Sequence, residues 1–172
     1  MLSAFPIAIE WLNTSLQSIV EGTNSQKGNF AVVSTFLPEI EIWNLDQADA
    51  VEPEMVLGGE IISSKKKPKK FTNKAKKFKE GSHTDSVLSL SINSSHKNIL
   101  ASGSSDCTLK VWDLSKAANI HTSNHHQGKL SKVKWSPTDF SVIFTASEDG
   151  RIGVLDSRFP NDTLFHKMPF QD

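Results

Sequence analysis

The sequence predicts an all-β protein of about three four-stranded blades, which together make an incomplete β-propeller. Two observations predict this fold class. Short strand patterns alternate with turns through most of the chain, and the clearest strand-rich module, from His83 to Leu114, is repeated 43 residues later. A period of roughly 40 to 45 residues is that of four-stranded propeller blades.

The two copies of this module align without a gap. Each has strand patterns that correspond to 87–92, 99–104 and 109–112 of the first copy, with a tight turn between the last two. The aligned pairs include His83 with His126, Ser102 with Thr145, Asp106 with Asp149, and Trp112 with Leu155. Because a leucine cannot donate a hydrogen bond, we expect the blade of the second copy to be less strongly specified.

A more divergent copy precedes this module. Its strand patterns lie at 5–12, 30–36, 39–44 and 55–57. Residues 13–29 are mostly polar and predict a long hairpin loop. This copy lacks both the leading His and the turn Asp.

These patterns divide the chain into five parts. The parts are a first blade at 1–62, a lysine-rich disordered loop at 63–81, a second blade at 82–122, a third blade at 123–168, and the truncated start of a further blade at 169–172. The outer strands of the second and third blades are expected at 117–121 and 162–167. Since a closed ring needs at least four blades, we expect the sequence to be a piece of a longer product.

The charge of the chain is unevenly distributed. The 19 basic and 19 acidic residues cancel, but nine of the basic residues are lysines between Lys65 and Lys79. Outside that segment 10 basic residues face 19 acidic ones, a net charge of −9. A lone cysteine, Cys107, no apolar run of roughly 18 residues and no signal peptide predict a cytosolic or nuclear protein without a membrane span.

The sequence contains no recognisable catalytic, cofactor or metal motif. Phosphate-binding glycine loops, nucleophile elbows and H-E-x-x-H helices are all absent from it. Ser104, Asp106 and His83 suggest a hydrolase triad, but the same pattern recurs with the core repeat, which favours a structural role. The histidines His121, His125 and His126 lack a second ligand group at zinc-site spacing. We therefore predict a protein that is not an enzyme and binds no cofactor or metal.

The module ends its third strand pattern with the dipeptide Trp112-Asp113, and it resembles the tryptophan-aspartate (WD) repeat family. The resemblance implies a hydrogen-bonded set of His83, Ser102 (or Ser104, on the same face), Asp106 and Trp112. In the next copy it implies the corresponding set of His126, Thr145 and Asp149. A buried indole and a buried imidazole each need a partner, which a hydroxyl or a carboxylate supplies.

The spaces between the repeats resemble a narrower family, that of periodic tryptophan protein 1. The resemblance runs from about Phe5 to Pro160 and includes F-P-I-A-I-E-W-L, E-I-E-I-W-N-L-D, E-P-E-M-V-L-G, the lysine insert and H-T-D-S-V-L-S-L. It implies a nucleolar scaffold in ribosome biogenesis and ribosomal RNA processing. Its partners would be ribosome-assembly factors or pre-ribosomal particles.

The lysine insert has two functional interpretations besides that of a solvated loop. Its lysines are Lys65, Lys66, Lys67, Lys69, Lys70, Lys74, Lys76, Lys77 and Lys79. The cluster K-K-K-P-K-K at 65–70 is typical of nuclear import signals. The same charges could neutralise RNA phosphates without sequence preference. We rank nuclear import first and RNA contact second.

Two alternatives remain open at the level of sequence. The chain could be a cytoplasmic WD-repeat adaptor in a ubiquitin-ligase or signalling complex, in which the lysine insert is incidental. Open blade edges would also allow a homodimer that completes a ring.

Overall fold

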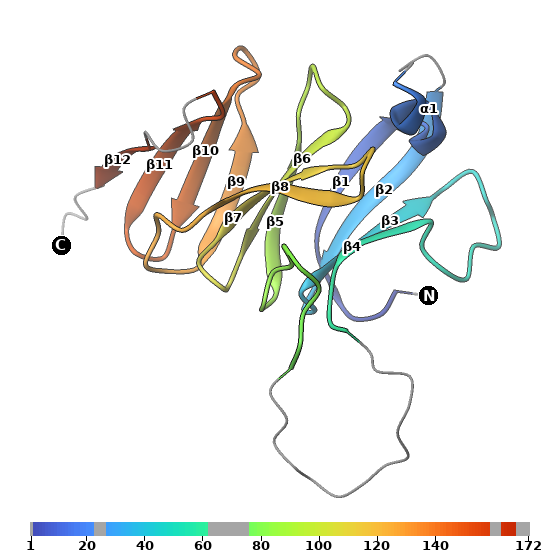
Figure 1. Ribbon diagram of the computed structural model, residues 1–172, viewed down its shortest axis with the longest axis horizontal. Coiled ribbons are helices and arrows are strands. Elements are labelled where there is room, and N and C mark those ends of the chain that lie inside the picture. The colour runs from blue at the N-terminus through green and yellow to red at the C-terminus, as the bar shows by residue number, and fades with distance from the viewer. Residues whose placement is uncertain (1, 23–26, 62–75, 159–162, 168–172) are drawn as a thin grey trace, which may run out of the picture.

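The computed structural model describes residues 2–22, 27–61, 76–158 and 163–167 and shows three antiparallel sheets of four strands each. Figure 1 shows the sheets side by side, with the first sheet on the right, the second in the centre and the third on the left. The predicted all-β fold of three propeller blades is confirmed.

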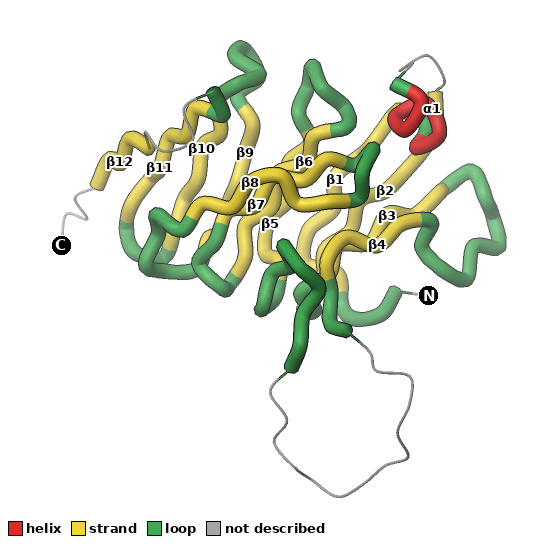
Figure 2. Tube along the Cα trace, viewed as in Figure 1, coloured by secondary structure: helices red, strands yellow, loops and turns green. Residues whose placement is uncertain are grey.

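Each blade is an up-and-down meander in which strands that follow one another in the chain are neighbours (Figure 2). The first blade contains β1 (Pro6–Thr14), β2 (Lys27–Thr35), β3 (Glu39–Asn44) and β4 (Met55–Gly58). The second contains β5 (Val87–Ile92), β6 (Ile99–Ser104), β7 (Leu109–Asp113) and β8 (Ala118–Ser123). The third contains β9 (Leu130–Trp135), β10 (Val142–Ser147), β11 (Arg151–Asp156) and β12 (Thr163–Lys167).

The second blade is covered on both faces, because successive side chains of a strand point to opposite sides of the sheet. On one face Leu90, Leu100 and Trp112 lie in the core shared with the first blade. On the other face Ala101 and Val111 lie in the core shared with the third blade. Every residue of β7 is therefore buried.

The first strands of neighbouring blades are in contact, β1 with β5 and β5 with β9. Two serines of β5 also bond to β9. The hydroxyl of Ser89 accepts the backbone N–H of Val133 at 3.0 Å, and the hydroxyl of Ser91 accepts that of Trp135 at 3.1 Å. Because both serines are buried, these bonds satisfy backbone groups that water cannot reach.

The prediction of a polar loop at 13–29 is wrong. Strands β1 and β2 extend into this segment, and the helix α1 (Leu16–Glu21) lies between them. Ser15 caps the helix by accepting the N–H of Ser18 at 3.1 Å, and Gly22 ends it in the left-handed conformation. The helix forms here because Leu16 and Ile19, one turn apart, are both buried in the core of the first blade.

The end of the predicted disordered loop is ordered. The N–H of Lys79 donates to the carbonyl of Gly59 at 2.9 Å, and the N–H of Ile61 donates to the carbonyl of Lys77 at 2.7 Å. Residues 77–79 therefore pair with residues 59–61, which follow β4. The start of the loop, at 63–75, lies outside the described residues, as do residues 169–172.

Candidate functional site

A chain of hydrogen bonds links four side chains in the second blade. Trp112 on β7 donates its indole N–H to the hydroxyl of Ser102 on β6 at 2.8 Å. That hydroxyl lies 2.7 Å from Nε2 of His83, and Nδ1 of His83 lies 2.9 Å from Oδ2 of Asp106. The structure thus brings together the four residues that the WD resemblance implied. Ser104 has a different role: its hydroxyl accepts the backbone N–H of Asp106 at 3.1 Å and donates to the carbonyl of Asp85 at 3.1 Å.

One order of donors and acceptors satisfies every group in this chain. The Ser102 oxygen accepts the indole N–H and has one proton to donate, which goes to Nε2 of His83. The His83 ring is then neutral and donates its Nδ1–H to Asp106. Asp106 also accepts the backbone N–H groups of Thr84 and Thr108, both at 2.9 Å. Its carboxylate thus joins the turn between β6 and β7 to the segment that leads into β5.

The electrostatics of the network agree with a neutral histidine and an ionised aspartate. Burial lowers the pKa of His83 from 6.5, and this effect outweighs the hydrogen bond and the charge of Asp106, which raise it. Burial alone would raise the pKa of Asp106, but the hydrogen bonds from His83, Thr108 and Thr84 hold it well below its usual range.

The third blade repeats this network without the indole. Nδ1 of His126 lies 3.0 Å from Asp149, and Nε2 lies 2.8 Å from the hydroxyl of Thr145. Leu155 is buried at the position that corresponds to Trp112. The Thr145 hydroxyl donates instead to the carbonyl of Gly153 at 3.3 Å. Three of the four residues are therefore kept, but nothing replaces the indole as a donor, because the Gly153 carbonyl only accepts.

Asp149 holds its turn as Asp106 does. Its carboxylate accepts the backbone N–H groups of Gln127 and Arg151, each at 3.0 Å. Burial would raise the pKa of Asp149, but these N–H groups and His126 lower it. The carboxylate is thus ionised in both networks at neutral pH.

The first blade has a different bond, which sequence reasoning missed. Trp43 on β3 donates its indole N–H to Glu41 on the same strand at 2.8 Å, and the N–H of Ser3 donates to the other carboxylate oxygen at 3.3 Å. Glu41 is only 3% exposed. The signal that could have found it is an acidic residue two positions before the repeat tryptophan, since such residues share a face of a strand.

The order Ser102, His83, Asp106 matches that of a serine hydrolase triad, but its position prevents catalysis. A nucleophile must reach a substrate carbonyl. Ser102 and His83 are each 0% exposed, and the Ser102 oxygen already accepts the Trp112 indole. The recurrence of the arrangement in the third blade also indicates a structural role. We therefore interpret both networks as structural hydrogen bonds that hold together the strands and turns of the second and third blades.

The histidines near the end of the second blade do not converge. His126 belongs to its blade network, and Nδ1 of His125 pairs with the hydroxyl of Ser123. Burial, together with the nearby His125, lowers the pKa of His121. Within the described part of the chain, no three His, Cys, Asp or Glu side chains lie close enough to hold a metal ion.

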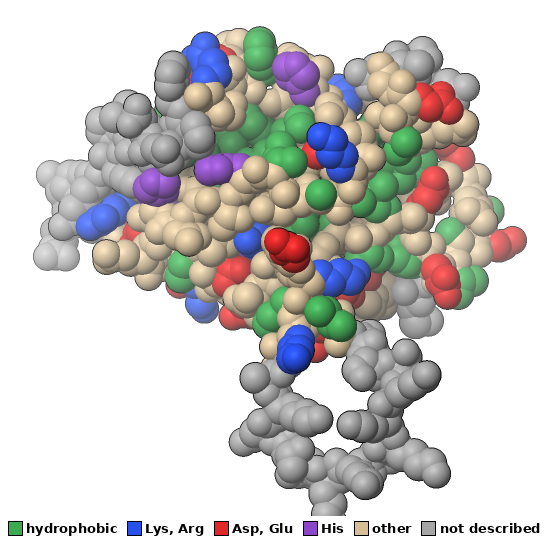
Figure 3. Space-filling model, viewed as in Figure 1, with side chains coloured by type: hydrophobic (Ala, Val, Ile, Leu, Met, Phe, Trp, Pro, Cys, Tyr) green, Lys and Arg blue, Asp and Glu red, His purple; other side chains and the backbone are tan. Residues whose placement is uncertain are grey.

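Three lysines of the insert are described, and each has different neighbours. Lys76 pairs with Glu60 at 2.5 Å, Lys77 accepts a backbone bond, and Lys79 lies at the mouth of a cavity. The other lysines, at 65–74, lie outside the described residues. On the face seen in Figure 3, acidic and basic side chains of the described residues are interspersed. No helix in the described ranges is long and apolar enough to cross a membrane.

The repeated blades with their His and Asp networks are those of the class of WD-repeat propeller proteins. The family model described as "WD domain, G-beta repeat" matches residues 75–113 and 118–156, which contain both networks. The chain belongs to the WD40-repeat family, as its sequence pattern predicted. Domains of this family generally bind other proteins.

Within this family the chain is related to periodic tryptophan protein 1. It is 38% identical to periodic tryptophan protein 1 of Saccharomyces cerevisiae over 97% of its own length and 29% of the relative. It is 32% identical to the periodic tryptophan protein 1 homolog of Drosophila melanogaster over 92% of its length and 31% of the relative. The chain thus spans about three tenths of the length of these curated relatives.

Similarity to other WD-repeat proteins covers less of the chain. A guanine nucleotide-binding protein subunit beta of Oryza sativa subsp. japonica is 43% identical, but over 44% of the chain and 20% of the relative. The relatives named periodic tryptophan protein 1 match through the segments between the repeats as well.

Proposed function

We propose that the chain belongs to a non-enzymatic scaffold that assembles proteins during ribosome biogenesis in the nucleolus. The observation that carries this proposal is the extent of the similarity to periodic tryptophan protein 1, which covers 97% of the chain, against 44% for a guanine nucleotide-binding protein subunit. The family resemblance implies this setting. Its partners are ribosome-assembly factors or pre-ribosomal particles.

The geometry of the blades supports a scaffold role. Both polar networks with triad-like chemistry are buried, so they hold the blades and leave the connecting loops to meet partners. The sheets support these loops, because the networks hold the second and third blades and the shared cores join all three blades. A scaffold of this kind needs only to bind its partners through the loops, without catalysing a reaction.

The lysine cluster at 65–70 supports a nuclear location. Five lysines in six residues form the kind of short basic motif that import receptors recognise. The rest of the chain is acidic, so the cluster is a local concentration of positive charge and does not reflect a basic chain.

The test is to replace these five lysines by glutamine in the protein as expressed in its own cells. We expect the variant to remain in the cytoplasm and to leave the fractions that contain pre-ribosomal particles, as measured by fluorescence microscopy and gradient sedimentation. A control variant removes five exposed lysines elsewhere, namely Lys27, Lys116, Lys129, Lys132 and Lys134. It should behave as the wild type.

An unchanged location and unchanged sedimentation of the 65–70 variant would contradict the import role. A wild-type protein that is cytoplasmic and co-purifies with a ubiquitin ligase or signalling complex would contradict the ribosome role and favour the adaptor alternative.

A further inference from the structure

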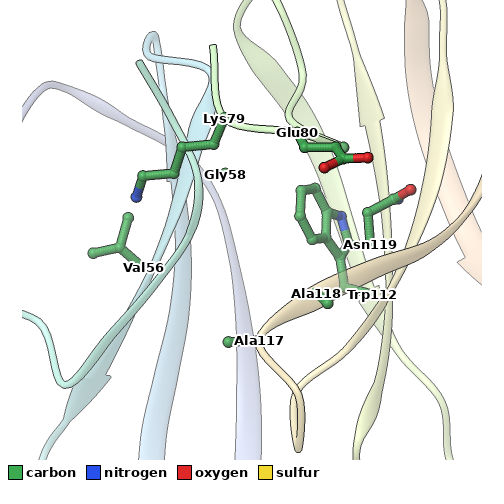
Figure 4. Close-up of a pocket in the computed structure, with 9 residues that line it drawn as sticks. Val56, Gly58, Lys79, Glu80, Trp112, Ala117, Ala118 and Asn119 are labelled. Atoms are coloured by element: carbon green, nitrogen blue, oxygen red, sulfur yellow. The ribbon is translucent and has the colours of Figure 1, made fainter. Parts of the chain in front are cut away.

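A cavity of about 530 Å³ lies between the outer strands of the first and second blades. Figure 4 shows its walls. Val56 and Gly58 of β4 lie on one side and Asn119 of β8 on the other, with Trp112 between them and Lys79 and Glu80 above. The cavity exists because the inner strands of these blades are in close contact while the outer strands diverge.

The loop that borders the cavity is held firmly. The hydroxyl of Ser82 accepts the N–H of Gly59 at 2.8 Å and donates to the carbonyl of His83 at 2.8 Å. The N–H of Ser82 donates to the carbonyl of Lys79 at 3.0 Å, which closes the turn that carries Lys79 and Glu80. The mouth of the cavity is therefore joined directly to the His83 network.

Two glycines keep the cavity open. Gly58 has a φ of +69°, and a Cβ there would lie 2.8 Å from the Ser82 hydroxyl and 3.3 Å from the Trp112 ring. Gly81 has a φ of +72°, and a Cβ there would lie 2.7 Å from Cβ of Asn119. A side chain at either position would strain the backbone and push on the cavity wall.

The charges at the mouth point to opposite ends of the cavity. In Figure 4 the Lys79 ammonium extends toward Val56, and the Glu80 carboxylate extends toward Asn119. Both side chains are exposed, and neither forms an ion pair within the described part of the chain. The mouth thus offers a cation on the side of β4 and an anion on the side of β8, where Trp112 lies (Figure 4).

The strands that line the cavity are the last strands of their sheets. β4 and β8 each have one edge without a strand beside it in the described sheets. The unpaired N–H and C=O groups of such an edge bind an extended peptide in the way that a sheet binds another strand. This favours a peptide over a compact small molecule as the occupant.

We propose that this cavity binds an extended peptide segment of a partner protein in which an acidic and a basic residue flank a small apolar residue. In an extended peptide residues i and i+2 point to the same side and residue i+1 points to the other. The acidic residue then meets Lys79 and the basic residue meets Glu80, while the small residue between them enters the cavity over Trp112. The inference goes beyond the ribosome-biogenesis role and does not depend on it.

The test is selection from a phage-displayed library of random ten-residue peptides against the 172-residue chain, followed by fluorescence anisotropy of the enriched peptides. We expect enrichment of the pattern acidic, small apolar, basic. Ala118→Trp, which fills the cavity from β8, should weaken the Kd of these peptides at least tenfold. Its circular dichroism and melting midpoint check that it folds.

A second variant tests the charges without filling the cavity. The exchange Lys79→Glu with Glu80→Lys should weaken binding of the original peptides at least tenfold and restore it for peptides with the two charges exchanged. The matched control exchanges Lys129 and Glu148, which are exposed outside the cavity, and should change nothing. No enrichment, enrichment of a different pattern, or a Kd that the Lys79 and Glu80 exchange leaves unchanged would overturn the proposal.

Discussion

Trp43 donates its indole N–H to Glu41, two residues earlier on the same strand, whereas Trp112 donates to Ser102 on the neighbouring strand. The strand registers explain the difference, because Val33 occupies in the first blade the place that Ser102 occupies in the second. A valine cannot accept a hydrogen bond. The first blade therefore satisfies its tryptophan with a carboxylate from its own strand and needs neither the His nor the Asp of the other blades.

The first prediction concerns this carboxylate. Glu41→Leu should lower the free energy of unfolding by about 1 to 3 kcal/mol, because the N–H groups of Trp43 and Ser3 lose their acceptor. Glu41→Gln keeps an acceptor oxygen and should cost less. Urea unfolding measures both, with the exposed Glu52→Leu as control. Equal stability of the wild type and Glu41→Leu would show that the bond contributes nothing.

The strands of the second blade could be predicted from the sequence because the repeat reinforces their alternation. The expected segments 87–92 and 99–104 agree with β5 and β6 as observed, and 39–44 agrees with β3. These strands have strong local patterns and are bounded by turns. The remaining strand ends differ by at most three residues, since the outer residues of a strand are fixed by pairing with their neighbours.

Features that depend on tertiary contacts were not predictable. The six-residue helix α1 is too short to be stable by propensity, and burial of Leu16 and Ile19 stabilises it. The choice between Ser102 and Ser104 also needed the structure. Both lie on one face of β6, but Ser102 bonds His83 and Trp112, whereas Ser104 bonds the backbone of Asp85 and Asp106.

The second prediction concerns pH. At a pH above about 6.5 the His83 ring is neutral in both the folded and unfolded chain. Below that pH the unfolded chain binds a proton that the folded chain resists, because burial lowers the folded-state pKa. The free energy of unfolding should therefore fall as the pH drops from about 6.5 toward the lower folded-state pKa, by up to about 1.4 kcal/mol per pH unit.

The measurement is urea unfolding of the wild type and His83→Gln between pH 7 and pH 5. Asp106 stays ionised in this window, because its pKa lies well below its usual range. The variant should be less stable at pH 7 but should lose less stability on acidification. Equal losses in the two proteins would mean that His83 takes up its proton as readily in the folded chain.

The third prediction concerns the bonds between the second and third blades. Ser89→Ala leaves the buried N–H of Val133 without its acceptor, and Ser91→Ala does the same to that of Trp135. Each should cost about 1 to 3 kcal/mol. Amide hydrogen exchange followed by NMR should show faster exchange at Val133 or Trp135 respectively. The exposed Ser131→Ala on β9 is the control, and it should leave both amides protected.

The last prediction separates backbone strain from crowding. Gly22 and Gly58 have nearly equal φ angles, +71° and +69°, but a Cβ at Gly22 meets nothing within 4 Å, whereas one at Gly58 lies 2.8 Å from the Ser82 hydroxyl. Gly22→Ala should cost about 1 to 2 kcal/mol from the left-handed backbone alone. Gly58→Ala should add about 1 to 3 kcal/mol, because Ser82 must move from its bonds to Gly59 and His83. Thermal unfolding measures both, and equal melting midpoints would mean that the loop around Ser82 yields without cost.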